Sequence, residues 1–150
     1  MSDMTATVID ASALAAYMLH EEGSEPIGQY LVEGVDSIGL VFKETASAIL
    51  AAEKNGRIDR SQADVCMEAL RTVIGHNVQA AGDQEGLLWE SHELARRYGT
   101  TIYDALCVVL AKRLGAKLVT KDAEQSELAI REGVEVGPQG IREMLLHSRT

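Results

Sequence analysis

Four acidic residues lie where an apolar run gives way to helix-forming residues: Asp10, Glu44, Asp104 and Asp122. Asp10 and Asp122 each follow a short apolar run typical of a buried strand, and Glu44 stands between such a run and an alanine-rich helical segment. Asp104 begins a segment, 101–111, that is too apolar all round for a surface helix and is therefore expected to pass through the middle of the domain. Each acid also has a local explanation, because carboxylates at helix starts accept backbone N–H groups and interact with the helix dipole.

A shared site explains the four acids together. Ligands of parallel α/β sheets bind beyond the carboxyl ends of the strands, where several turns converge. Carboxylates gathered there repel one another and raise each other's proton affinity unless a cation lies among them. The side chains are all oxygen ligands, with no His or Cys at metal spacing, so the site predicted is one for Mg²⁺ or Mn²⁺. Ser12 and Thr120 would support it by hydrogen-bonding a carboxylate or a phosphate oxygen, or would make purely local turn bonds.

The elements that must position these residues alternate between strand and helix. This pattern predicts an α/β fold, a three-layer α/β/α sandwich around a mostly parallel sheet of 4–5 strands. Expected strands cover residues 6–9, 37–42, 77–80, 117–120 and 134–136. Expected helices cover 12–19, 25–31, 43–53, 57–73, 83–97, 101–111 and 123–131, with a last helix through Ile141 and Leu145.

Length and composition indicate one domain, residues 1–150, with a core of Ala, Val, Leu and Ile and few aromatic residues. Cys66 and Cys107 have apolar helical neighbours and are expected to be small buried residues without a disulfide. The four histidines pair with no nucleophile and are expected at the surface or in structural roles. The first residues resemble neither a secretory signal nor a membrane span, so we expect a cytoplasmic protein.

A net charge of −9 argues against loose, charge-driven binding to nucleic acid, which depends on Lys and Arg neutralising phosphates. The excess of acids could instead attract a basic partner. Local basic groups exist at 96–97 and 112–113, and Lys43 and Lys121 stand beside two of the acids. The two doublets are of a kind common on solvated helix faces.

The motifs around the acids resemble the PIN domain family, most of all the small single-domain PIN proteins of the VapC toxin type. Residues 8–13, Val-Ile-Asp-Ala-Ser-Ala, resemble the family's first strand and first acid, and Glu44 resembles its second acid. Tyr103-Asp104-Ala105 resembles the third acid, and 114–122, ending in Leu-Val-Thr-Lys-Asp, the fourth. Two positions depart from the family pattern, Ser47 where Asn is frequent and Gln125 where an aromatic residue is frequent, so that Leu128 is expected to cover that part of the core.

This resemblance implies an endoribonuclease that depends on Mg²⁺ or Mn²⁺. Asp10 and Asp104 would be the principal metal ligands, and Glu44 and Asp122 would complete the site, bind a second ion or hold water. The resemblance also implies RNA as substrate, a VapB-like antitoxin with a basic tail as partner, and pairing into a homodimer.

Two other functions stay open at this point. One is a catalytically silent PIN-fold module whose acidic face binds a protein partner. The other is a phosphoryl-transfer α/β domain of the haloacid-dehalogenase or response-receiver kind, phosphorylated on Asp10. The dehalogenase pattern requires a second Asp two residues later, where this chain has Ser12, and no acidic pair precedes the first helix as in a receiver.

Overall fold

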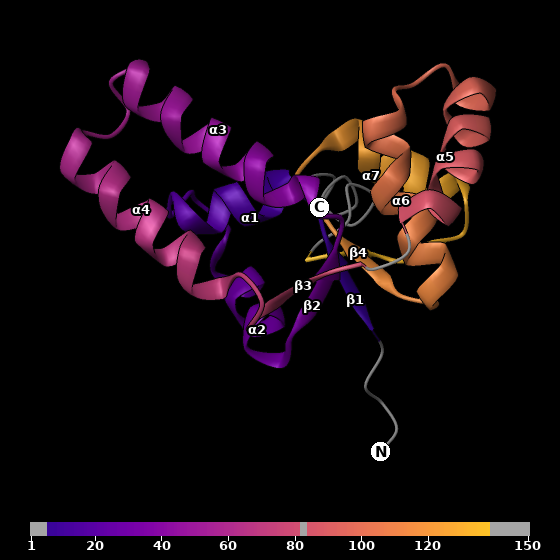
Figure 1. Ribbon diagram of the computed structural model, residues 1–150, viewed down its shortest axis with the longest axis horizontal. Coiled ribbons are helices and arrows are strands. Elements are labelled where there is room, and N and C mark those ends of the chain that lie inside the picture. Colours follow the sequence, from indigo (N-terminus) through magenta and orange to yellow (C-terminus); the bar gives the residue numbers. More distant parts are fainter. Residues whose placement is uncertain (1–5, 82–83, 139–150) are drawn as a thin grey trace, which may run out of the picture.

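A five-stranded parallel sheet forms the centre of the protein (Figure 1). The computed structural model describes residues 6–81 and 84–138. The strands, in the order β3-β2-β1-β4-β5, are β1 (Thr7–Ile9), β2 (Val35–Ser37), β3 (Val78–Ala80), β4 (Lys117–Val119) and β5 (Val136–Gly137). The helices are α1 (Ala11–Met18), α2 (Glu25–Glu33), α3 (Leu40–Lys54), α4 (Arg60–Val73), α5 (Gln84–Tyr98), α6 (Ile102–Leu114) and α7 (Ala123–Arg131).

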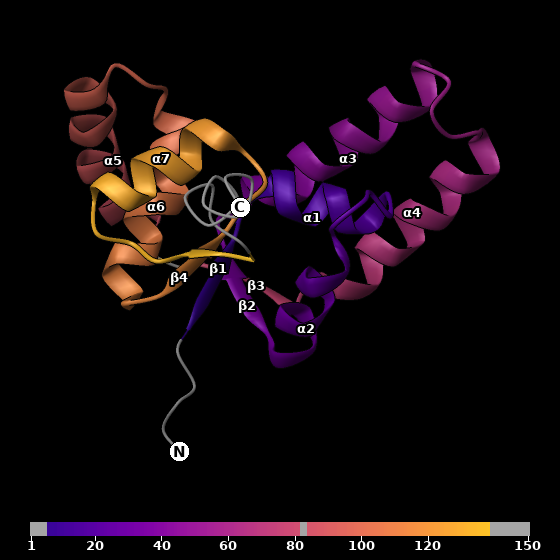
Figure 2. The same cartoon turned by 180° about the vertical axis from the view of Figure 1, so that it is seen from behind.

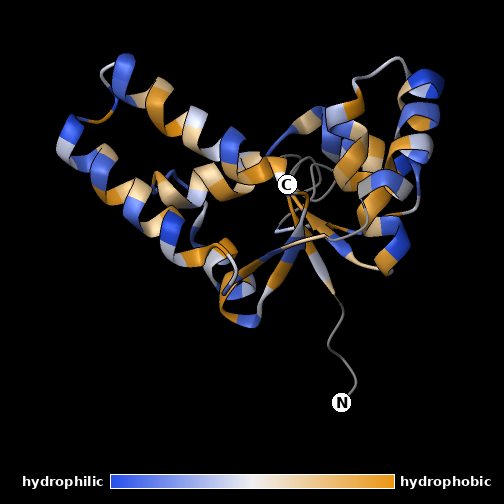
Figure 3. Cartoon of the chain, in the orientation of Figure 1, coloured by the Kyte–Doolittle hydropathy of each residue, from blue (hydrophilic) through white to orange (hydrophobic). Residues whose placement is uncertain are grey.

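Helices cover both faces of the sheet, which confirms the predicted three-layer α/β/α arrangement. Helices α1–α4 lie on one side and α5–α7 on the other (Figures 1 and 2). Neighbouring residues of β1 enter two different cores, because Val8 packs with the α5–α7 side and Ile9 with the α1–α4 side. Apolar residues gather on the strands and on the helix surfaces that face them, while the outer turns are hydrophilic (Figure 3).

The predicted strand 37–42 is wrong in its position. The strand is β2, Val35–Ser37, and the apolar residues from Leu40 to Phe42 form the first turn of α3. A short apolar run is compatible with either a strand or a buried helix, and here burial decides, because Val41 is fully enclosed in the core on the α1 side. Glu44 therefore lies within α3 and not at the end of a strand.

The other predicted elements are confirmed with shifts of a few residues. The largest are three residues, at the start of the helix predicted at 57–73, which begins at Arg60, and at the end of the helix predicted at 101–111, which ends at Leu114. The expected helix through Ile141 and Leu145 lies outside the described residues. Cys66 and Cys107 are both buried and free, as predicted, and the described histidines, His20, His76 and His92, are exposed. Within 6–81 and 84–138, no helix is both long enough and apolar enough to cross a bilayer.

Glu132, the residue after α7, joins the three helices on one side of the sheet. Its side chain is only 7% exposed, and its carboxylate accepts hydrogen bonds from Tyr98 Oη at 2.6 Å and Lys112 Nζ at 2.8 Å. Arg97 of α5 lies 3.6 Å away. The hydrogen bonds from Lys112 and Tyr98 lower the pKa of Glu132 below its usual value despite burial.

Replacing Glu132 with Gln should lower the free energy of unfolding at pH 7 by about 2 kcal/mol, because hydrogen bonds to a charged group are lost. A carboxyl whose pKa is lowered on folding stabilises the protein above its unfolded pKa and loses this effect as the pH falls through its folded pKa. The difference from wild type should therefore shrink in acid. Urea denaturation at pH 7 and at acidic pH measures it, with exposed Glu68→Gln as control. Equal stability of the Glu132 variant at pH 7 would contradict the prediction.

Candidate active site

Asp10 directly follows the central strand β1, and its carboxyl group is held inside the protein. The residue is 5% exposed and is the N-cap of α1, since Oδ1 accepts from the backbone N–H of Ala13 at 3.0 Å. Burial raises the pKa of Asp10, hydrogen bonds from Thr120, Ser12 and Ala13 oppose that rise, and the Asp122 carboxylate adds to it.

Two hydroxyl groups connect Asp10 to the turn after β4. Ser12 Oγ donates to Asp10 Oδ1 at 2.7 Å and accepts from the backbone N–H of Lys121 at 2.8 Å. Thr120 Oγ1 donates to Asp10 Oδ2 and accepts from the backbone N–H of Asp122 at 3.0 Å. Each hydroxyl has one proton, and both protons are directed at Asp10, so the 3.2 Å contact between the two oxygens adds no further hydrogen bond. Of the roles expected for this pair, the structure shows the carboxylate contact of both hydroxyls and, for Thr120, a local turn bond as well.

Removing one of these hydroxyls should weaken any activity that requires ionised Asp10. We expect Thr120→Ala to reduce any such activity by about tenfold or more, the usual effect of losing a hydrogen bond to a charged group. The pKa of Asp10 should rise further, which moves the acidic limb of the pH–rate profile to higher pH. Initial rates across a pH series measure both effects. Thr120→Ser should restore the profile and exposed Ser61→Ala should not alter it; an unchanged profile in Thr120→Ala would exclude this role.

Asp122 lies at the start of α7, as predicted from the apolar run before it. Its Oδ1 accepts from the backbone N–H groups of Glu124 at 2.9 Å and Gln125 at 3.2 Å. Gln125 does not complete a capping box with Asp122 among these residues, because its side chain donates to the backbone oxygen of Asp104 at 3.0 Å. The Asp122 carboxylate thus caps the start of α7, and it is also close enough to Asp10 to raise the pKa of Asp10.

Glu44 approaches the same region from the second turn of α3. The residue is exposed, yet the surrounding protein desolvates its carboxyl group, and this raises the pKa of Glu44. The carboxylates of Asp10 and Asp104 raise it further. Glu44 therefore lies within electrostatic reach of two other predicted site residues, although α3 begins earlier than the sequence suggested.

Asp104 lies in the first turn of α6, the buried central helix. Thr101 caps this helix, since its side-chain oxygen accepts from the Asp104 backbone N–H at 3.1 Å. The Asp104 carboxylate instead accepts from Thr100 Oγ1 at 3.1 Å. Sequence analysis missed Thr100, and it also missed Gln125 as a bridge between α6 and α7. A hydroxyl four residues before the acid was the available signal for Thr100.

Cys107, one helical turn after Asp104, lies beneath the acids. Burial raises the pKa of the Cys107 thiol well above its usual value, and the carboxylates of Asp10 and Glu44 add to the rise. Hydrogen bonds to the Ser37 side chain and the Ile38 backbone partly oppose it. The thiol is therefore neutral and contributes no charge to the site.

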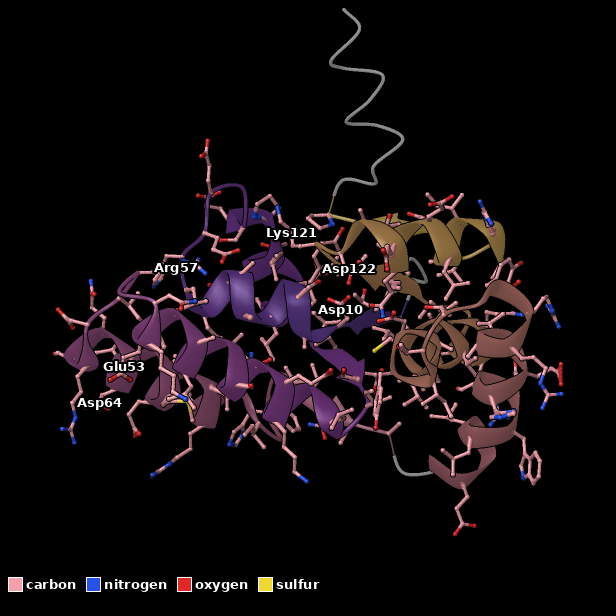
Figure 4. The ribbon with its side chains drawn as sticks, turned by 90° about the horizontal axis from the view of Figure 1, so that it is seen from above. Asp10, Glu53, Arg57, Asp64, Lys121 and Asp122 are labelled. Carbon is pink, nitrogen blue, oxygen red and sulfur yellow. The ribbon has the colours of Figure 1, made fainter. Side chains whose placement is uncertain are left out.

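The four predicted acids thus lie within electrostatic reach of one another, pair by pair. Asp10 is coupled electrostatically to Asp122, and Glu44 to both Asp10 and Asp104. Figure 4 shows Asp10 and Asp122 near each other, with Lys121 beside them, and Glu53 and Asp64 far away on α3 and α4. The donors are hard oxygens, which suit Mg²⁺ or Mn²⁺. In the described parts of the chain, however, no three His, Cys, Asp or Glu side chains are close enough together to hold an ion.

Hard oxygen donors and the lack of three clustered ligands among the described residues are compatible with a magnesium-like ion, because such an ion usually keeps several waters and binds through one or two carboxylates. Asp10 Oδ2 accepts one protein hydrogen bond and retains acceptor capacity, whereas Oδ1 accepts two. The carboxylates therefore fit a hydrated hard cation, with water completing its coordination.

The predicted basic doublets are largely engaged in ion pairs on the α5–α7 side. Arg97 and Lys112 contact Glu132, and Arg113 contacts Glu90 at 3.2 Å. Arg96 lies 3.7 Å from Glu93. These contacts agree with the expectation of solvated helix faces and leave the doublets few charges to offer a phosphate backbone.

Comparison with known proteins agrees with the sequence motifs and the fold. The PIN domain family model matches residues 7–131. The chain is 29% identical over 122 residues to Ribonuclease VapC3 of Pyrobaculum aerophilum, covering 80% of this chain and 92% of that protein. Its fold is similar to the crystal structure of PAE2754 from the same organism, with a TM-score of 0.67, 22% identity and coverage of 99% and 97%. The chain belongs to the PIN domain family.

Proposed function

We propose that this protein is a divalent-metal-dependent endoribonuclease that hydrolyses phosphodiester bonds of RNA. The observation that carries the proposal is the buried carboxylate of Asp10, oriented by two hydroxyls and electrostatically coupled to a group of further acids. Such a group is unfavourable on its own and becomes favourable around a cation. Membership of the PIN family and the similarity to a VapC ribonuclease support the same function.

The hydrogen bonds of each acidic side chain suggest its role in the proposed metal site. Asp10 and Asp104, each fixed by hydroxyl donors, would be the principal ligands of Mg²⁺ or Mn²⁺. Glu44 and Asp122 would complete the site by orienting water or a second ion. A bound ion would supply an activated water molecule and neutralise charge on the leaving oxygen. Hydrogen bonds from Ser12 and Thr120 favour the ionised form of Asp10, and both hydroxyls hold the turn that carries Asp122.

Wild-type protein should bind Mn²⁺ in a calorimetric titration and cleave RNA only when Mn²⁺ or Mg²⁺ is present. Chelation with EDTA should stop cleavage and renewed addition of metal should restore it. Cleavage that persists in EDTA would contradict the proposed mechanism.

A second candidate is a catalytically silent PIN module that binds a protein through its acidic face. The absence of three metal-ligating side chains in close contact, among the described residues, favours this alternative. The same titration separates the two functions, because a silent module should show no heat with millimolar Mn²⁺ and no cleavage.

We further propose that the protein is the cytoplasmic toxin of a toxin–antitoxin pair. The similarity to Ribonuclease VapC3 supports this role, and the net charge of −9 suits a VapB-like antitoxin with a basic tail. Pairing into a homodimer belongs to the same proposal. Expression of the wild type should arrest growth, whereas Asp10→Asn should not. Harmless overexpression of an enzyme that is active in vitro would count against the toxin role.

A further inference from the structure

A cavity of about 280 Å³ lies beside the acids, where the end of α5 meets α7. Its polar lining includes Tyr98 and Thr100 on one side and Glu124, Glu127 and Arg131 of α7 on the other. None of these residues belongs to the predicted metal-binding group.

The cavity shares two residues with the surroundings of the acids. Thr100 lines the cavity and donates from Oγ1 to Asp104 Oδ2 at 3.1 Å. Glu124 lines it as well, and its backbone N–H donates to Asp122 Oδ1 at 2.9 Å. A nucleotide whose phosphate lies at the acids therefore has this cavity as a neighbouring place for a base.

The lining offers mainly hydrogen-bond acceptors. Thr100 and Tyr98 donate their hydroxyl protons to Asp104 and Glu132, so their oxygens can only accept from a ligand. The carboxylates of Glu124 and Glu127 are acceptors and repel an anion. Arg131, which pairs with Glu127 at 2.7 Å, is the charged donor of this lining. The cavity thus disfavours a phosphate and favours a neutral ligand rich in N–H groups with one acceptor edge.

We propose that this cavity binds a guanine base of the RNA substrate, an inference that rests on the proposed nuclease function. Guanine presents N1–H and the N2 amino group side by side to a carboxylate, and its O6 and N7 accept from Arg. Adenine and cytosine have a single exocyclic amine, and uracil has only one ring N–H. Among the four bases, guanine therefore matches the acceptors and the one arginine best.

Sequencing of the products from a random RNA pool tests the proposal. Wild type should enrich guanine at one fixed position relative to the cleaved bond. Glu127→Gln should reduce this enrichment by about tenfold, the effect of one bidentate base contact. Glu68→Gln on α4 removes the same charge far from the cavity and should leave the enrichment unchanged. Cleavage without guanine enrichment, or equal enrichment in Glu127→Gln, would overturn the inference and leave the nuclease function standing.

A binding measurement separates this inference from the nuclease function. In NMR titrations with the four nucleosides, guanosine should shift the backbone amides of Thr100, Glu127 and Arg131 more than adenosine, cytidine or uridine. Glu127→Gln should weaken those shifts. A protein that cleaves no RNA but shows these shifts would refute the nuclease and keep the guanine site. Equal or absent shifts with all four nucleosides would refute the site.

Discussion

Asparagine in place of Asp10 is expected to reduce metal-dependent RNA cleavage by about 10²–10³-fold, the scale seen when one electrostatic group of an active site is removed. The amide oxygen can keep the hydrogen bonds that Oδ1 accepts from Ser12 and Ala13, so the turn after β1 should persist. What disappears is the negative charge, together with the hydrogen bond that Oδ2 accepts from Thr120, because an amide NH₂ group only donates. Asp104→Asn should have an effect of the same order, because Thr100 can still donate to the amide oxygen.

The assay compares initial cleavage rates in Mn²⁺ for the wild type, both variants and a charge-matched control. Asp64→Asn is a suitable control because Asp64 is exposed on α4, far from Asp10 (Figure 4). It should cleave at the wild-type rate. Wild-type rates in Asp10→Asn and Asp104→Asn would refute the assignment of these acids as metal ligands needed for cleavage.

The wild type and Asp10→Asn should exchange their order of melting temperature when metal is added. Burial raises the pKa of Asp10 in the folded protein, so the ionised carboxylate opposes folding. The protonated carboxyl contributes its full stability below the pKa of the unfolded chain, and this contribution is lost as the pH rises through the pKa of the folded protein. Without divalent metal at pH 7, Asp10→Asn should therefore melt at a higher temperature than the wild type. The difference should close as the pH falls through the raised pKa of Asp10.

With Mn²⁺ present, the wild type should become the more stable protein. An ion at a hundred times its Kd stabilises the folded state by about 2.7 kcal/mol, which corresponds to roughly 5–10 °C in Tm for a domain of this size. Calorimetric scans in EDTA and in Mn²⁺ measure the change, with Asp64→Asn expected to follow the wild type. A wild type whose Tm does not respond to Mn²⁺ would favour the silent binding module.

The sequence was most informative where local pattern and site coincide. A β-branched run followed by an acid predicts both the strand β1 and the place of Asp10, since carboxyl ends of parallel strands share one edge. The same logic holds for β4 and Asp122. This reasoning was less reliable for Glu44, because the hydrophobic periodicity of the apolar run before it does not distinguish a strand from a buried helix. Glu44 lies within electrostatic reach of Asp10 and Asp104, while its element was assigned incorrectly.

Contacts between distant segments could not be predicted. Whether Ser12 and Thr120 face a carboxylate or a substrate depends on the pairing of β1 with β4, which brings together residues 108 positions apart. Gln125 follows Asp122 at capping-box spacing, yet its side chain bonds to Asp104 because α6 and α7 pack together. Local rules describe the backbone around each acid, whereas the orientation of these side chains is a property of the assembled sheet.

The hydrogen bonds from Ser12 and Thr120 to Asp10 can form together only after the ribosome has synthesised the chain as far as Thr120. Asp10 is translated 110 residues before Thr120, which donates a hydrogen bond to its carboxylate. A prematurely terminated polypeptide that lacks Thr120 also lacks β4, the neighbour of β1 in the sheet. Truncated translation products therefore cannot complete the surroundings of Asp10.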